Sequence, residues 1–198
     1  MKKILNLIIV FLVIVLLLFL GYYFYNREVG TKVYFGEKPD IPIPLDNSFE
    51  FKTVDNRVFK LKTGKKKMII EGLEDKIIFL KVFGWDCQYC KKEIPQLINL
   101  KNNLDNSFKI IAIEAEKHTN EESLKYIKKY GINYDIVNGN NQKRFYDYLK
   151  SNYGWSGLIP LTIILGKGGD ILAYEVGVKS YNLSELMHNA LLREKSKK

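Results

Sequence analysis

The amino-terminal end of the chain carries its longest apolar segment. Residues 7–20 are apolar without a break, and the stretch from Ile4 to Tyr25 is interrupted only by one asparagine and one glycine. A helix of that length would rise about 33 Å, which is enough to cross a hydrocarbon core of about 30 Å. The pattern therefore predicts a single transmembrane helix within residues 1–25.

The residues that flank this segment set its predicted orientation. Lys2 and Lys3 precede the apolar run, and three tyrosines follow it at the depth where aromatic side chains favour the membrane boundary. The positive-inside rule leaves the amino terminus in the cytoplasm and places everything after Asn26 outside. A cleaved secretory signal is the alternative, but the small residues of a cleavage site are missing after Gly21. Both interpretations export the remainder of the chain.

The pattern changes after the apolar segment. Residues 26–46 contain three prolines and two glycines with little periodicity, which is typical of an extended linker. Alternation of apolar and polar residues then begins near Phe49, pauses at a turn at residues 55–56 and returns over residues 58–61, which predicts a β-hairpin. Residues 64–67 are interpreted as an exposed loop.

Five further segments are rich in β-branched and aromatic residues and predict strands. The first, residues 76–83, is apolar almost throughout, as in a strand that is buried on both faces in the middle of a sheet. The others lie at residues 108–115, 134–137, 161–165 and 171–176. The last two are joined by the glycine-rich residues 166–170, which lack the ending of a phosphate-binding loop and are interpreted as a hairpin turn.

Four segments have the periodicity of helices. The first follows the two cysteines, and the second begins at a capping box formed by Thr119 and Glu122 and ends at Gly131. The third runs to about residue 152, and the fourth carries an apolar stripe from residue 183 to 191. A strand, a helix and a strand in this order predict a right-handed crossover between parallel strands. The domain is therefore predicted to have an α/β fold.

The composition narrows the class of protein. The chain has 198 residues, of which 46% are hydrophobic, and only two cysteines, which excludes a disordered chain and a disulfide-dense miniprotein. Its 31 basic and 22 acidic residues give a formal net charge of +9. Residues 193–198 are expected to form a basic carboxyl-terminal tail. Charge runs beside turns are usually solvated, and nucleic acid is not an expected partner outside the cytoplasm.

The two cysteines, Cys87 and Cys90, form a C-x-x-C pair between a predicted strand and a predicted helix. The free N–H groups and the dipole at a helix start stabilise a thiolate, so Cys87 is the better-placed nucleophile and Cys90 the resolving thiol. In the expected cycle the Cys87 thiolate attacks a partner disulfide. Cys90 then attacks Cys87 and releases the reduced partner.

Two other uses of the cysteines have weaker support. A permanent stabilising disulfide is compatible with an exported protein, but closing so short a loop removes little chain entropy. A zinc site needs two further ligands, and the two histidines, His118 and His188, fall in a predicted loop and on the last predicted helix. No metal and no cofactor are therefore expected.

Two further residues have a place in this chemistry. Glu93 follows Cys90 by three residues and so lies on the same side of the helix, where a partly buried carboxylate could exchange protons with the Cys90 thiol. An ordinary surface charge is the alternative for Glu93. Pro160 directly precedes a predicted strand, and the sequence alone does not tell whether its peptide bond is cis or trans.

Together these features resemble the thioredoxin superfamily, and within it the membrane-anchored thiol-disulfide oxidoreductases of the TlpA/ResA type. The resemblance rests on residues 83–95, FGWDCQYCKKEIP, and on residues 157–162, GLIPLT, and it covers about residues 46–192. Two positions depart from the family pattern. Tyr89 stands where the family usually has a proline, and Trp85 lies one step earlier than the usual tryptophan.

The resemblance implies a thioredoxin-like fold over residues 47–192: a central mixed sheet flanked by helices, with an amino-terminal β-hairpin and an inserted strand and helix. It implies that Pro160 is cis and packs beside the disulfide. It further implies that Ile159 and Trp85 take part in substrate binding, and that Glu93 is the acid that transfers protons.

The resemblance also implies a cellular role. It describes a single-pass protein of the bacterial cell (inner) membrane whose catalytic domain is periplasmic or extracytoplasmic. Such a protein reduces disulfides in protein substrates, for example apocytochrome c, with electrons from a membrane thiol-disulfide relay. Asp86 beside Cys87 opposes the thiolate electrostatically and so weakly favours a reducing role. The alternatives are an oxidant or isomerase of exported proteins, and a noncatalytic module that binds a thiol partner or copper.

Overall fold

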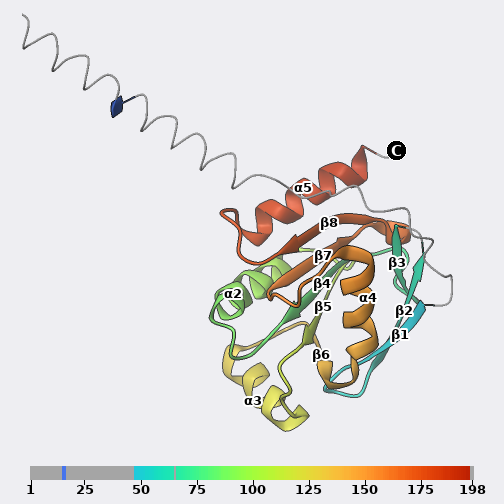
Figure 1. Cartoon of the computed structure of the whole chain (residues 1–198), viewed down its shortest axis with the longest axis vertical. Coiled ribbons are helices and arrows are strands. Elements are labelled where there is room, and N and C mark those ends of the chain that lie inside the picture. Colours follow the sequence, from blue (N-terminus) through green and yellow to red (C-terminus); the bar gives the residue numbers. More distant parts are fainter. Residues whose placement is uncertain (1–14, 17–46, 65, 197–198) are drawn as a thin grey trace, which may run out of the picture. The chain divides into compact units, whose positions relative to one another are not determined.

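The computed structural model describes residues 15–16, 47–64 and 66–196 (Figure 1). Of the predicted membrane anchor, only Val15 and Leu16 are described, and both are helical. The rest of that anchor and the predicted linker at residues 26–46 lie outside the described residues. Within the described ranges, no helix is both long enough and apolar enough to cross a membrane.

A small antiparallel sheet opens the domain. It consists of β1 (Asn47–Lys52), β2 (Val58–Gly64) and β3 (Lys67–Ile70), in the order β1-β2-β3. The predicted hairpin is confirmed, because β1 pairs with β2 from Asn47 opposite Thr63 to Lys52 opposite Val58.

The exposed loop predicted at residues 64–67 is confirmed in part. Lys66 and Lys67 are exposed, and Lys66 is a turn residue in the left-handed region at φ 64°. The ends of the predicted loop are strand residues instead, because Gly64 ends β2 and pairs with Lys67, which begins β3. The following strand β3 alternates in burial, with Met68 and Ile70 in the core. A short strand that begins in a run of lysines has too few apolar positions for its alternation to stand out.

The central sheet has five strands in the order β6-β5-β4-β7-β8. Strand β4 (Ile77–Phe83) is parallel to β5 (Phe108–Glu114), which is parallel to β6 (Asp135–Asn138). On its other side β4 is antiparallel to β7 (Leu161–Leu165), which pairs with β8 (Ile171–Val176) as a hairpin. The predicted mixed sheet is therefore confirmed, with β4 at its centre and buried along its whole length.

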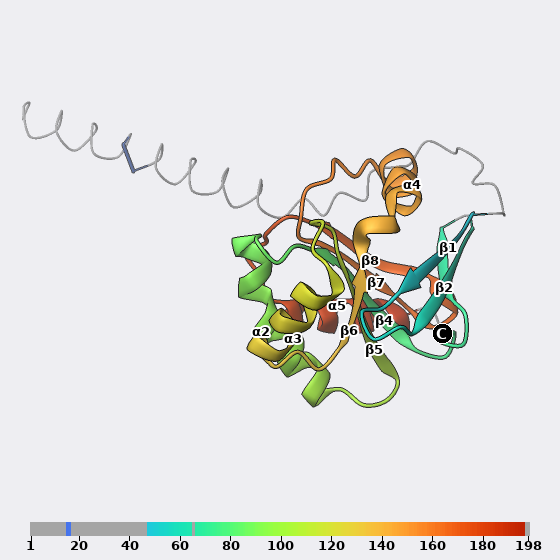
Figure 2. The same cartoon turned by 90° about the horizontal axis from the view of Figure 1, so that it is seen from below.

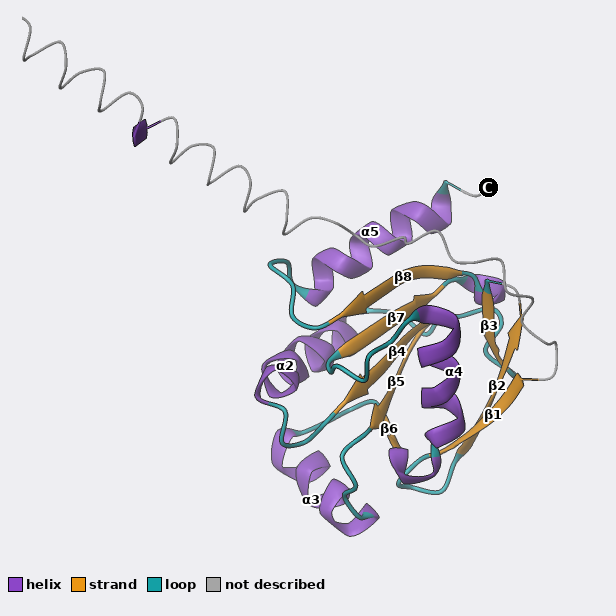
Figure 3. Cartoon of the chain, viewed as in Figure 1, coloured by secondary structure: helices purple, strands orange, loops and turns teal. Residues whose placement is uncertain are grey.

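Four helices accompany this sheet, and Figure 3 shows them in purple. They are α2 (Gln88–Asn103), α3 (Asn120–Tyr130), α4 (Lys143–Tyr153) and α5 (Leu183–Lys195), with short 3-10 turns η1 (Gly139–Asn141) and η2 (Lys167–Gly169). The predicted capping box at Thr119 and Glu122 is present, and Gly131 ends α3 at φ 64°. Helix α5 extends to Lys195, so the first residues of the expected basic tail are helical.

The two faces of the central sheet are covered differently, as Figures 1 and 2 show. Ile78, Leu80 and Val82 of β4 belong to a core shared with α4 and the small sheet. Ile77 and Phe79 belong to a second core shared with α2 and α5. The segment between β5 and β7 contains β6 with α3 and α4, which accommodates the extra strand and helix that the family resemblance implies.

Candidate active site

The two cysteines lie where β4 passes into α2. Cys87 caps the helix, and its sulfur accepts a hydrogen bond from the Cys90 N–H at 3.1 Å. The two residues form a disulfide with a Cα–Cα distance of 5.2 Å. Cys87 is partly exposed, whereas Cys90 is only 2% exposed. An incoming group can therefore reach Cys87 and not Cys90.

The loop before β7 lies against this pair. The Ile159–Pro160 peptide bond is cis, as the resemblance implies. Ile159 packs against the hydrophobic cluster that contains both cysteines, and Pro160 is buried. The Pro160 carbonyl accepts a hydrogen bond from the Gly177 N–H at 2.7 Å, which fastens the segment after β8 to the same place. Three segments that are far apart in the sequence thus meet at the disulfide.

Each of these segments exposes one large apolar side chain. Tyr89, Leu158 and Val178 are all more than half exposed. A carbon added at Gly177 would lie in van der Waals contact with Leu158, so these last two segments touch. Most large apolar residues of the domain are buried, and exposed apolar side chains that gather around a reactive group are typical of a surface that binds a partner.

Trp85 corrects one of the predictions. Its side chain has no exposed surface, so in this conformation it offers none to a substrate. Its indole N–H donates a hydrogen bond to Ser123 Oγ at 3.1 Å, and its ring stacks on Tyr126 of α3 with centroids 4.9 Å apart. Trp85 therefore packs between the segment that leads to the cysteines and α3, and its partners on α3 explain why it is buried.

Glu93 lies one turn after Cys90 on α2 and is partly buried, and its partner is a buried lysine. Its side chain is 16% exposed, and its Oε2 lies 2.7 Å from Nζ of Lys81, whose side chain is 1% exposed. Lys81 Nζ also donates a hydrogen bond to Thr162 Oγ1 at 2.7 Å. Burial lowers the pKa of Lys81, and the charge and hydrogen bond of Glu93 oppose that shift.

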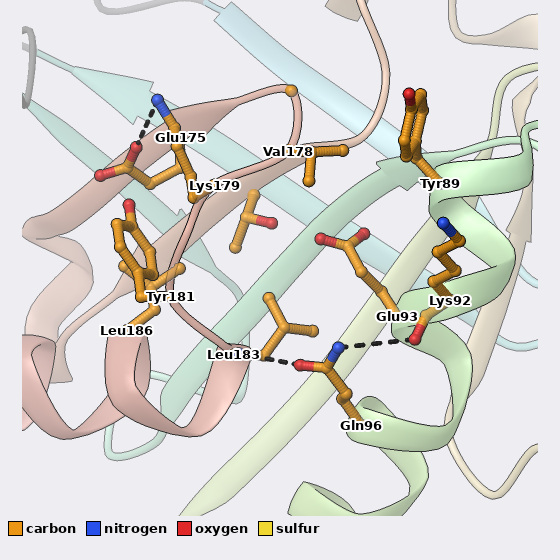
Figure 4. A pocket seen from close by; sticks show the side chains of 12 residues that line it. Tyr89, Lys92, Glu93, Gln96, Glu175, Val178, Lys179, Tyr181, Leu183 and Leu186 are labelled. Atoms are coloured by element: carbon orange, nitrogen blue, oxygen red, sulfur yellow. Dashed lines mark hydrogen bonds and ion pairs between the residues drawn. The ribbon is translucent and has the colours of Figure 1, made fainter. Parts of the chain in front are cut away.

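A cavity of about 170 Å³ adjoins Glu93. Figure 4 shows the Glu93 carboxylate pointing into it, between α2 and the segment that leads from β8 to α5. Gln96 closes one side, because its Oε1 accepts a hydrogen bond from the Leu183 N–H at 3.0 Å. Glu175 and Lys179, paired at 3.3 Å, line another part of the cavity.

Sequence reasoning missed Lys81. One lysine within a long apolar run does not change the prediction of a buried strand, and its partner lies on a different element. A signal was nevertheless present, because lysines are almost never fully buried without a partner. A lysine in the middle of a strand predicted to be buried on both faces therefore requires a nearby carboxylate.

A second charged cluster includes Asp86, the residue directly before Cys87. Nδ1 of His118 is 3.0 Å from Oε1 of the buried Glu114, and its Nε2 is 3.4 Å from Oδ2 of the exposed Asp86. Oε2 of Glu116 accepts a hydrogen bond from the Asp86 N–H at 2.7 Å. Burial raises the pKa of Glu114. His118, which lies in a predicted loop, therefore pairs with two carboxylates, one of them on Asp86 directly before the nucleophile.

Asp86, Glu116 and His118 are the group in the described part of the chain whose ligand atoms could hold a metal ion, since these atoms lie within 4.8 Å of one another. Glu116 and His118 already use atoms of this cluster in the contacts above, and Asp86 is exposed. The cluster is explained by its internal contacts, and no step of the chemistry requires a metal there.

Comparison with known proteins relates the chain to a known family. A family model described as thioredoxin-like matches residues 75–171, from the start of β4 to the start of β8. The chain therefore carries a thioredoxin-like domain. Within the thioredoxin superfamily it resembles the TlpA/ResA type, since its sequence is 28% identical over 127 residues to the thiol-disulfide oxidoreductase ResA of Bacillus subtilis.

The similarity to ResA covers part of each protein. The alignment spans 64% of this chain and 63% of the Bacillus subtilis protein, and the ResA of Bacillus anthracis is 26% identical over 57% of this chain and 61% of its own length. The chain therefore spans less than two thirds of the length of the ResA proteins that it matches.

Solved structures share the thioredoxin fold. A putative thioredoxin from Neisseria meningitidis superposes with a TM-score of 0.57 at 18% identity, over 76% of this chain and 91% of that one. StoA from Bacillus subtilis superposes with a TM-score of 0.51 at 19% identity, over 76% of this chain and 98% of that one. At such low identities these likenesses extend to the fold alone.

Proposed function

We propose that the chain is a thiol-disulfide oxidoreductase that exchanges electrons between its Cys87–Cys90 pair and disulfides of protein substrates. The observation that carries this proposal is the asymmetry of the pair: an accessible sulfur at the start of α2 and a buried sulfur one turn further on. The cis-proline loop beside the pair supports the proposal. The similarity to ResA, which is named a thiol-disulfide oxidoreductase, also supports the proposal.

The chemistry follows from this asymmetry. In the reduced protein the start of α2 stabilises the Cys87 thiolate, which attacks one sulfur of the substrate disulfide. A Cys87–substrate disulfide forms and the other substrate sulfur leaves as a thiolate, which takes up a proton. Cys90 then loses its proton and attacks Cys87, so that the protein disulfide forms and the second substrate sulfur leaves. Two electrons pass from the protein to the substrate.

The surroundings of the pair favour a protein substrate. Tyr89, Leu158 and Val178 offer exposed apolar surface on the segments that carry the cysteines and the cis-proline, and Ile159 packs on the same cluster as the cysteines. A polypeptide segment could pack on these side chains while its disulfide meets Cys87. In this proposal Ile159 and Pro160 form the floor of the substrate-binding surface.

For the direction of transfer we favour reduction of substrates. The carboxylate of Asp86 directly precedes Cys87 and opposes a negative charge on its sulfur, which favours the protein disulfide over the dithiol. A protein whose disulfide is favoured gives its electrons away. The family resemblance makes apocytochrome c the candidate substrate and a membrane thiol-disulfide relay the candidate electron donor.

We further propose that residues 1–25 anchor the protein in the bacterial cell membrane, with the thioredoxin-like domain on the extracytoplasmic side. The support is the apolar segment with its preceding lysines. A cysteine pair that cycles with exported proteins also belongs in a compartment where disulfides persist.

Two serine variants test the proposed activity. The reduced full-length chain, in a mild detergent, is mixed with a disulfide-bonded probe protein, and the products are resolved without reductant. Cys90→Ser should accumulate a covalent complex with the probe that dithiothreitol releases, because Cys87 can attack but nothing resolves the product. Cys87→Ser should form no complex and show no turnover.

The wild-type chain and the Cys87→Ser/Cys90→Ser double variant are the controls. Turnover retained in either single variant would contradict the two-thiol mechanism, since the chain has no third cysteine that could replace the missing one.

A further inference from the structure

A buried lysine occupies the centre of the sheet directly below the active site. Lys81 lies on β4 in the same alternation as Phe79 and Phe83, so its side chain emerges on the face that α2 covers. Its ammonium group is 2.7 Å from Glu93 Oε2 and 2.7 Å from Thr162 Oγ1. The side chain is almost completely shielded from water, with 1% exposed.

This ion pair is poorly explained by stability alone. Removing two charges from water is costly, and the attraction between them offsets this cost only where the geometry is good and hydrogen bonds satisfy the remaining polar atoms. Replacing a buried ion pair by apolar residues of similar volume is often neutral or stabilising. A lysine kept in the middle of a strand that is otherwise apolar therefore indicates a role other than packing.

The pair joins the three elements that carry the active site. Lys81 is on β4, which leads directly to Cys87, and Glu93 is on α2, one turn after Cys90. Thr162 is the residue opposite Lys81 on β7 and follows Pro160 by two residues. The position of the Glu93 carboxylate is thus fixed relative to both cysteines and to the cis-proline loop.

Other titratable groups lie around Glu93, but none of those described forms an ion pair with it besides Lys81. Glu175 is paired with Lys179. Tyr134 directly precedes β6, and burial raises its pKa, as does the charge of Glu93. Among the described residues, Lys81 is the only cation within ion-pair distance of Glu93. Besides Glu93, the titratable residues that line the cavity are Tyr89, Lys92, Glu175, Lys179 and Tyr181.

We propose that Lys81 is a positioning residue that holds the Glu93 carboxylate in place one helical turn after Cys90, so that Glu93 accepts the Cys90 proton when the mixed disulfide is resolved. This inference rests on the proposed oxidoreductase function and assigns one step of it. The proton moves from Cys90 Sγ to the Glu93 carboxylate as the Cys90–Cys87 bond forms and the Cys87–substrate bond breaks. The partly exposed Glu93 then returns the proton to water through the adjoining cavity.

The test uses 5,5′-dithiobis(2-nitrobenzoate) as the disulfide, because it reports the two steps separately. The reduced full-length chain releases one coloured thiolate when Cys87 attacks the reagent and a second when Cys90 resolves the mixed disulfide. Stopped-flow absorbance over a range of pH gives one rate profile for each step. The first phase serves as an internal control, since it does not involve Glu93.

Lys81→Met should leave the first phase unchanged and alter the second. Without the ammonium group the partly buried Glu93 carboxylate loses its ion-pair partner, so its charged form is less favoured and it accepts the Cys90 proton less readily. The acid limb of the second-phase profile should move upward by about one pH unit, which slows this phase about tenfold on that limb. In a Glu93→Gln background the same substitution should produce no further shift.

Lys109→Met is the matched control. Lys109 also forms a sheet ion pair, with the buried Asp135, but it lies on β5 and lines a different hollow from the cavity at Glu93. Its removal should leave both phases unchanged. If circular dichroism finds Lys81→Met unfolded, Thr162→Val takes its place, because it removes the acceptor that fixes Lys81 and should shift the second phase in the same direction.

The outcomes separate the two proposals. A wild-type chain that releases no thiolate in either phase would overturn the oxidoreductase function and the role of Lys81 with it. Two normal phases in the wild type, with an unshifted second phase in the folded Lys81 variant or its Thr162 substitute, would overturn the role of Lys81 alone. A shift of equal size with and without Glu93 would also overturn it, because Lys81 would then act through another group.

Discussion

His118 shows how single residues next to Cys87 combine burial with charge. Burial lowers its pKa, but the hydrogen bond and the charge of Glu114 outweigh this effect, so the pKa of His118 is raised. A histidine whose pKa is raised on folding stabilises the native state below its unfolded pKa of about 6.5, and this contribution is lost as the pH rises through the folded pKa.

His118→Gln should therefore destabilise the chain more at about pH 6 than at about pH 8. At the lower pH the variant should lose about 1.5 kcal/mol of its free energy of unfolding relative to the wild type, the low end for a hydrogen bond to a charged group. Urea unfolding at both pH values measures it. His188→Gln is the matched control, since His188 is exposed on α5. An equal cost for His118→Gln at both pH values would show that protonation of His118 does not contribute.

At the residue scale, the sequence predicts the chemical role of a side chain better than it predicts which residues surround that side chain in the fold. The nucleophile and the resolving thiol follow from the C-x-x-C spacing at a helix start, and the burial of Cys90 agrees with those roles. Lys81 and His118 were missed because each depends on a carboxylate placed by the fold. Trp85 was misjudged for the same reason, since only its partners on α3 explain its burial.

At the scale of elements, local signals predict most of the domain. The capping box of Thr119 and Glu122 marks the start of α3, and β-branched runs identify β4, β5 and β7. These signals are reliable because a capping box and an apolar strand are each defined by residues that lie close together in the sequence. Strand β3 escaped prediction because it has four residues and begins next to a turn of charged residues.

The joining of elements depends on contacts that no local pattern contains. Tyr89, Leu158 and Val178 lie on three separate segments, and the fold brings these segments together at Cys87. The hydrogen bond from Gly177 to Pro160 and the pairing of Lys81 with Thr162 are long-range contacts of this kind. The sequence predicts the strands and the helix that take part but not the surface that they form together.

At the scale of the whole molecule, the proposed anchor has a direct test. Membranes that contain the full-length chain are washed with alkaline carbonate, which removes peripheral proteins. The chain should stay in the membrane fraction, and mass spectrometry should find residues 1–25 still attached, because the apolar segment is long enough to span the hydrocarbon core.

A variant without residues 1–25 is the control and should be absent from the washed membranes. Release of the full-length chain by carbonate would contradict the anchor. A membrane-free product that lacks the apolar segment would instead identify the segment as a cleaved signal.

The central claim is that Cys87 and Cys90 cycle reversibly, and their redox equilibrium tests it most directly. The full-length chain is equilibrated in dithiothreitol and glutathione buffers, and the fluorescence of Trp85, which packs in the same cluster as both cysteines, follows the transition. We expect one reversible two-electron transition with a potential closer to about −270 mV than to about −120 mV, as for a reductant. A potential near the higher value would reverse the proposed direction of transfer. The absence of any reversible transition would contradict the account and favour a noncatalytic binding module.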